Sequence, residues 1–184
     1  MLLVALFFGP LILSWVLVRY GAEHMDIEAH SYGELLTPVV TLETFEIEGD
    51  PGLTIDQLRG VWTLIYPLNG SCGEQCETVV TQTRQVRTAL AKDMGRLQRV
   101  VIWANGSQQA SLPLDDPARH PALTVIRGST EQLQPLWGQL PGKVEEALYL
   151  VDPMGNVLMR YPLDFEGKPL LKELGFLLKS SVLG

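Results

Sequence analysis

The sequence predicts an α/β domain, with a mainly parallel sheet and helices on both faces, behind an apolar N-terminal segment. From residue 53 onward, short apolar runs typical of buried strands alternate with segments of helical periodicity. The only two cysteines, Cys72 and Cys76, directly follow one of these runs. Hydrophobic residues make up 46% of the chain, so the domain can bury a core without a framework of disulfides.

The first 20 residues are predicted to form a transmembrane anchor. Residues 2–18 carry no charge and would rise about 26 Å as a helix, close to the roughly 30 Å hydrocarbon core of a bilayer. A cleaved signal peptide is the alternative, but no Lys or Arg precedes the run and no small-x-small cleavage site follows it. Arg19 is the only flanking basic side chain, and on its own it favours a cytoplasmic position for the globular part.

Residues 21–52 are polar and read as a linker that contains an edge strand at 41–47. The globular domain is assigned to residues 53–184. A Pro-x-Gly-Asn turn at 153–156 between two apolar runs predicts a hairpin, and Ser129 or Thr130 is suited to cap a helix. The expected elements are strands at 61–66, 100–104, 123–126, 147–151 and 157–161, helices at 75–92, from about 130 and at 170–178, and a long loop at 105–121.

The charge pattern excludes several function classes. A net charge of −7 argues against a nucleic-acid partner, and the recurring basic residues from Arg84 to Arg99 are expected to form a solvated helix face. No Gly-rich phosphate loop, HExxH motif or Ser/His/Asp constellation is present, so hydrolase and nucleotide chemistry lack support. The carboxylates of Asp115, Asp116 and Asp152 are interpreted as turn residues.

The cysteine pair is the main candidate site. A strand that ends in a cysteine loop and continues into a helix is the layout of thioredoxin-like proteins, where two thiols serve redox exchange or bind soft metals such as Cu(I). A plain disulfide or two inert thiols is the structural alternative. Glu74 and Glu77 are expected to raise the pKa of the thiols, because a nearby negative charge opposes the thiolate.

Candidates for a third metal ligand are few. His120 lies in the loop before the strand at 123–126, where the common alternative is a solvated side chain. His24 and His30 lie in the linker. Glu145 and Glu146 offer hard oxygen atoms, which are poor ligands for Cu(I).

Three segments together resemble the Sco/SenC family, over roughly residues 53–180: the Cys-x3-Cys loop at 72–76, the strand and helix cap at 123–133, and the strand and turn at 149–157. Those proteins are membrane-anchored, thioredoxin-like copper-binding factors for cytochrome c oxidase assembly. The resemblance implies a single-pass protein of the inner membrane with its domain in the periplasm, against the weak indication from Arg19. It also implies that Cys72 and Cys76 bind Cu(I), and that the partners are oxidase subunits or other assembly factors.

Two departures from the family pattern keep other functions open. Glu77 replaces the proline that follows the second cysteine in Sco proteins, and no histidine stands at or near Val144, where their third copper ligand is expected. The first interpretation is an assembly factor that handles Cu(I) or thiol redox state. The alternatives are a general thiol–disulfide oxidoreductase and a degenerate, non-catalytic accessory protein bound to a respiratory complex.

Overall fold

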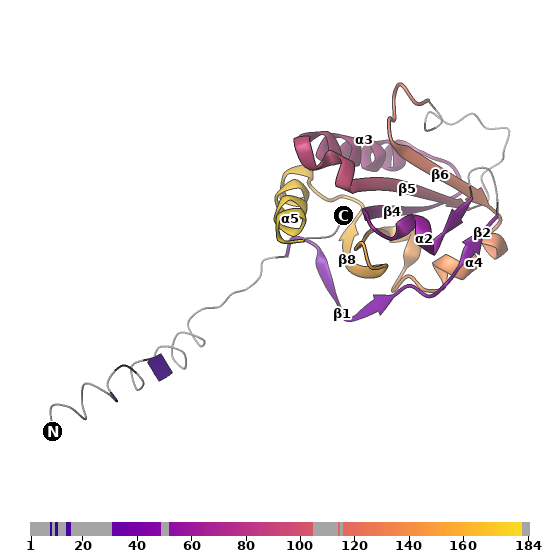
Figure 1. Ribbon diagram of the computed structural model, residues 1–184. Helices are drawn as coiled ribbons and strands as arrows, with labels where there is room; N and C mark the ends of the chain where they lie inside the picture. The colour runs from indigo at the N-terminus through magenta and orange to yellow at the C-terminus, as the bar shows by residue number, and fades with distance from the viewer. Residues whose placement is uncertain are drawn as a thin grey trace. The chain divides into compact units, whose positions relative to one another are not determined.

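The computed structural model describes residues 8, 10, 14–15, 31–48, 52–104, 114 and 116–181 (Figure 1). The chain divides into two units, Met1–Ser31 and Tyr32–Gly184, and the description below concerns the second. Among the described residues, no helix has the length and apolar character needed to cross a membrane. The anchor expected at residues 1–20 lies outside the described residues, apart from positions 8, 10, 14 and 15.

The domain is built on a six-stranded mixed sheet with the strand order β1-β8-β7-β4-β5-β6. Strands β4, β5 and β6 run parallel, whereas β7, β8 and β1 join by antiparallel pairing. The expected mainly parallel sheet is therefore corrected to a mixed one, because the terminal hairpin and β1 fill half of it. The strands are β1 (Glu34–Thr41), β4 (Trp62–Asn69), β5 (Leu97–Ala104), β6 (Leu123–Gly128), β7 (Ala147–Val151) and β8 (Asn156–Pro162).

Helices cover both faces of this sheet, as the sequence predicts. Helices α3 (Glu74–Ala89) and α5 (Gly167–Ser180) bury their apolar stripes against one face, with Val79, Leu170 and Leu174 in the shared core. The other face is covered by α2 (Ile55–Leu58), α4 (Thr130–Trp137) and the short pair β2 (Glu46–Ile47) and β3 (Leu53–Thr54). Two 3-10 helices, η1 (Ala91–Arg96) and η3 (Val144–Glu146), lead into β5 and β7.

Local signals in the sequence fix several of these boundaries. Ser129 caps α4: its side chain accepts a hydrogen bond from the Gln132 backbone N–H, and the Gln132 side-chain oxygen accepts one from the Ser129 backbone N–H. In the β7–β8 turn, one carboxylate oxygen of Asp152 accepts the backbone N–H groups of Met154 and Asn156. Asp152 is therefore a turn residue, as predicted.

The region interpreted as a linker differs most from the prediction. Residues 34–41 form β1, which pairs with β8, so the folded domain begins before residue 53. The strand expected at 41–47 is interrupted by four residues without regular structure between β1 and β2. Most β1 side chains are exposed and Pro38 lies among them, so the segment lacks the alternation that marks a strand, although an edge strand tolerates both features.

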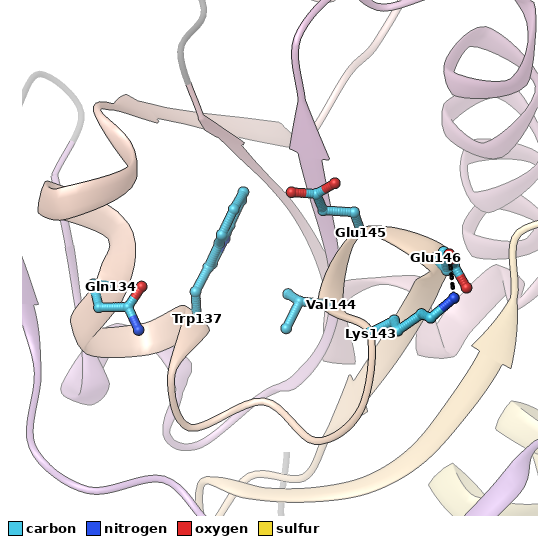
Figure 2. Close-up of a pocket in the computed structure, with 6 residues that line it drawn as sticks. All are labelled: Gln134, Trp137, Lys143, Val144, Glu145 and Glu146. Carbon is cyan, nitrogen blue, oxygen red and sulfur yellow. Dashed lines mark hydrogen bonds and ion pairs between the residues drawn. The ribbon is translucent and has the colours of Figure 1, made fainter.

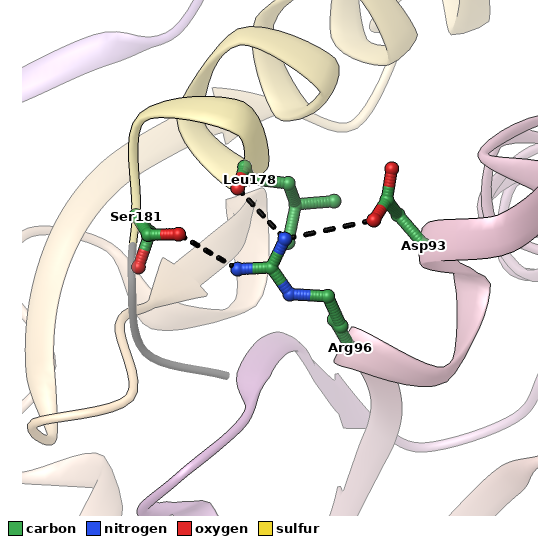
Figure 3. Close-up of polar contacts among 4 residues, drawn as sticks. All are labelled: Asp93, Arg96, Leu178 and Ser181. Carbon is green, nitrogen blue, oxygen red and sulfur yellow. Dashed lines mark hydrogen bonds and ion pairs between the residues drawn. The ribbon is translucent and has the colours of Figure 1, made fainter.

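The basic residues do not form one solvated helix face. Arg99 lies in β5 and is only 2% exposed. Arg96 ends η1 and donates to the carbonyl oxygens of Leu178 (2.8 Å) and Ser181 (3.0 Å) at the end of α5, with Asp93 at 3.6 Å (Figure 3). Both arginines donate to backbone carbonyl oxygens of other segments, which is a structural role.

Candidate functional site: the disulfide loop

The two cysteines are joined by a disulfide at the point where β4 passes into α3. β4 is buried along its length up to Asn69, residues 70–73 form the connecting loop, and α3 begins at Glu74. Gly70 adopts a φ of +79°, a conformation that L side chains rarely adopt. The loop brings the Cα atoms of Cys72 and Cys76 to 5.1 Å from one another. The pairing that sequence reasoning treated as one alternative is thus present, and the redox role of the pair stays a prediction.

The two sulfur-bearing residues differ in their access to solvent. Cys76 is 3% exposed and packs in the core beside Val79 and Val80 of α3. Cys72 precedes the helix and is only partly buried. An external thiol therefore meets Cys72 more readily than Cys76, and this asymmetry is suited to thiol–disulfide exchange.

A cavity of about 340 Å³ adjoins the disulfide. Its walls come from the end of β4, the cysteine loop and the start of α3, with Glu145 of η3 and Leu163 closing the far side. Asn69 donates its side-chain N–H to Oε1 of Glu145 at 2.8 Å, and this bond joins η3 to the end of β4. Sequence reasoning assigned no role to Asn69. Its position as the last residue of a buried strand beside the cysteine loop is the signal that marks it.

A second pocket, of about 410 Å³, lies between α4 and η3 (Figure 2). Glu145 lines both pockets, so the two adjoin along this residue. Trp137 forms part of the wall and is 7% exposed, and its indole Nε1 has no hydrogen-bond partner among the described residues. Lys143 pairs with Glu146 at 3.1 Å, which leaves the Glu145 carboxylate with the Asn69 amide.

The structure does not bring His120 to the cysteines. His120 lies just before β6. Arg99 pairs in register with Leu123 at the start of β6, and its guanidinium donates to the carbonyl oxygen of Pro121, the residue after His120, at 2.8 Å. This is the amino end of the parallel strands, whereas the disulfide lies at the carboxyl end of β4. Burial, followed by the charges of the nearby arginines, holds the pKa of His120 below its ordinary value.

Arg99 dominates the amino end of the strands. One guanidinium nitrogen donates to the Val80 carbonyl oxygen at 3.1 Å and another to that of Pro121, so backbone dipoles rather than a carboxylate hold this charge. Burial, with Arg87 and Arg84 nearby, lowers the pKa of Arg99 to about 10. Arg84 adds a hydrogen bond to the carbonyl oxygen of Arg119.

No third metal ligand emerges from the described residues. Within them, no three His, Cys, Asp or Glu side chains are grouped so that they could hold a metal ion. His24, His30 and Asp115 lie outside the described residues. The side chains lining the cavity that could bind a metal are Cys76, closed in the disulfide with Cys72, and the carboxylates of Glu74 and Glu145.

The fold and the disulfide at the β4–α3 junction define a thioredoxin-like protein with a Cys-x3-Cys loop. Residues 62–181 match the sequence family described as transmembrane-like, thioredoxin-like, C-terminal domain, and the chain belongs to this family. No curated protein matches the chain.

Solved structures confirm the resemblance to Sco proteins. Copper-bound yeast Sco1 matches with a TM-score of 0.65 and 20% identity, over 78% of this chain and 95% of that one. BsSco, a member of the Sco family of cytochrome c oxidase assembly proteins in which a disulfide switch was identified, matches with a TM-score of 0.56 and 14% identity, over 81% and 98%. A thiol:disulfide interchange protein from Bacteroides sp. matches at 0.53 and 11%, over 82% and 91%. At these low identities, the structural matches establish a shared fold alone.

Proposed function

We propose that this protein is a membrane-anchored factor in cytochrome c oxidase biogenesis that cycles Cys72 and Cys76 between disulfide and dithiol. The observation that carries the proposal is the disulfide itself, which adjoins a cavity in a fold shared with Sco proteins. The proposed location is the inner membrane, with residues 1–20 as a single-pass anchor and the domain in the periplasm. The proposed partners are oxidase subunits or other assembly factors.

The unequal burial of the two cysteines supports a redox cycle. A partner thiolate would attack the more exposed Cys72, and the sulfur of buried Cys76 would leave as a thiolate at the first turn of α3. A helix N-terminus favours that anion, because the unpaired backbone N–H groups carry a partial positive charge. Glu74 and Glu77 in the same turn act in the opposite direction, so the thiols of the reduced loop are expected to be less reactive than those of a disulfide oxidase.

Copper transfer is the second candidate function. Once the disulfide is reduced, two cysteine sulfurs in one short loop are soft donors suited to Cu(I) as cargo, and yeast Sco1 carries copper in the same fold. The Glu145 carboxylate beside the cavity would add a hard oxygen, a poorer partner for Cu(I) than imidazole. The donor set therefore favours redox exchange over copper storage.

The test is complementation with the double variant Cys72→Ser/Cys76→Ser. In a strain lacking the native gene, the redox and copper functions both require that this variant fails to restore oxidase activity, whereas Thr88→Ala, at an exposed position of α3 away from the cavity, restores it. Full activity of the double variant would replace the proposal with a non-catalytic accessory role. Anaerobic Cu(I) titration of the reduced full-length protein then separates the two cysteine functions, since one-to-one binding lost in the double variant would assign copper handling.

A further inference from the structure

We propose that Glu74 and Glu145 make the Cys72–Cys76 disulfide selective for positively charged thiols, and that its natural substrate is a cysteine in a basic, extended segment of a partner polypeptide. The inference rests on the redox part of the proposed function. It adds the chemical class of the substrate and two residues that determine specificity.

The charge around the disulfide has one sign. Glu74 and Glu145 both line the cavity, and none of the described residues that line it is Lys, Arg or His. Lys143, which precedes η3 and lines the second pocket, is paired with Glu146. The Asn69 amide that binds Glu145 is neutral. The two carboxylates therefore attract a cationic thiol and repel an anionic one.

The pocket beside Glu145 indicates that the substrate is a polypeptide. Trp137 is more than nine-tenths buried, yet its Nε1 donor has no partner among the described residues. The Nε1 atom is closed off from solvent, so a polypeptide segment laid into this pocket would pack against the part of the Trp137 ring that lines it rather than hydrogen-bond to the N–H. Figure 2 shows the Glu145 carboxylate pointing toward the Trp137 ring, so one extended segment could contact both while its cysteine reaches the loop.

The exchange balances as an ordinary two-electron transfer. The thiolate of the partner attacks Sγ of Cys72, a mixed disulfide forms, and the Cys72–Cys76 bond breaks. Cys76 leaves as a thiolate and takes a proton from water. A second thiol of the partner then attacks the mixed disulfide and releases Cys72, so the partner is oxidised to a disulfide and the loop is reduced to a dithiol. The two carboxylates take no part in the bond exchange. They affect only the association step, by raising the local concentration of a basic segment.

The first test uses small thiols that differ only in charge. The oxidised full-length protein in a neutral detergent is reduced by cysteamine (cationic), 2-mercaptoethanol (neutral) or 3-mercaptopropionate (anionic) at equal thiolate concentration, and free thiols are trapped by alkylation. At about 10 mM salt, where screening acts over roughly 30 Å, cysteamine should react about tenfold faster than 3-mercaptopropionate, and the ratio should fall toward one near 1 M salt.

Matched variants assign this ratio to the two carboxylates. Glu74→Gln/Glu145→Gln should bring the ratio at low salt to about twofold or less. Glu46→Gln/Asp56→Asn removes two exposed carboxylates of β2 and α2, which line neither pocket, and should leave the ratio unchanged. Equal rates for the three thiols, or an equal loss in both double variants, would overturn the proposal.

The second test asks whether the substrate is a polypeptide. Two unstructured peptides with one central cysteine, flanked by lysines in one and by glutamates in the other, replace the small thiols. The basic peptide should react faster, and Trp137→Phe, which reduces the ring that lines the pocket, should lower the ratio of its rate to the cysteamine rate about threefold, the effect of a small loss of apolar contact. An unchanged ratio would overturn the role of Trp137. A charge preference together with full oxidase activity of the double cysteine variant would instead refute the oxidase function and leave selectivity intact.

Discussion

The two ends of the parallel strands in this domain differ in the sign and in the burial of their charged side chains. At the carboxyl end, exposed Glu74 and Glu145 border a cavity beside the disulfide. At the amino end, Arg99 is enclosed by the domain and bound by backbone carbonyl oxygens. A buried charge held by backbone is part of the folded structure, because removing it leaves a cavity and takes one hydrogen bond from each of its carbonyl partners. Exposed carboxylates at a cavity contribute little to stability and are available to act on a ligand.

The sharpest way to test this comparison is to remove the buried charge. Arg99→Ala should destabilise the domain by about 3 kcal/mol or more, because it leaves a cavity and removes one hydrogen bond each from the carbonyl oxygens of Val80 and Pro121. Urea unfolding of the full chain in detergent measures the effect. Arg59→Ala is the control: it breaks an exposed ion pair with Asp56 and should cost less than about 0.5 kcal/mol. Similar losses in both variants would contradict a structural role for Arg99.

Opening the disulfide should have the next largest effect on stability. The bond closes a short loop, so its removal increases the conformational entropy of the unfolded chain only a little. The free energy of unfolding should fall by about 2 kcal/mol if this entropy is the main effect. Urea unfolding of Cys72→Ala/Cys76→Ala should agree with that of the wild type in reductant. A variant that cannot fold would show that the disulfide is a structural staple, contrary to its proposed cycling.

At the amino end, His120 makes stability depend on pH. Its pKa in the folded domain lies below the ordinary value of about 6.5 that the unfolded chain retains. As the pH falls through about 6.5, the unfolded chain therefore binds a proton that the folded domain does not, and stability is lost. The comparison to make is the unfolding free energy at about pH 7.5 and pH 5.5, and His120→Gln should lose less on acidification than the wild type. An equal loss would assign the acid sensitivity to other groups.

The smallest expected effect on stability belongs to the carboxyl end. Glu145→Gln keeps an acceptor for the Asn69 amide and changes an exposed side chain, so the unfolding free energy should move by less than about 0.5 kcal/mol. Thermal unfolding in detergent is sufficient to check this. A loss above about 1 kcal/mol would mean that Glu145 is as structural as Arg99, and the contrast between the two ends would fail.

The buried strands are the part of the fold that the sequence predicts correctly. Strands β4, β5 and β7 are continuous apolar runs, and the Asp152 turn has a local sequence signature, so these elements were predicted. β1 was not, because its exposed side chains carry no alternation. The prediction that Arg99 lies on a solvated helix face is wrong, because the spacing of basic residues does not show which of them is buried.

The candidate site was reached in the same partial way. The Cys72–Cys76 loop has a local pattern, and both cysteines lie where that pattern predicts. The meeting of Asn69 with Glu145 depends on η3 reaching the end of β4, and the separation of His120 from the cysteines depends on strand direction. Neither relation can be predicted from a single segment of the sequence.

The pairing of β1 with β8 sets where a recombinant fragment has to begin. Glu173 of α5 accepts hydrogen bonds from the backbone N–H groups of Tyr32 and Gly33 and from the Tyr161 hydroxyl, so the chain is tied to the domain from residue 32. A fragment cut at residue 53 would lack β1 and bare the outer edge of β8. Such an edge offers unpaired backbone groups to a second molecule, and the shortened protein would self-associate where one that starts before residue 32 stays monodisperse.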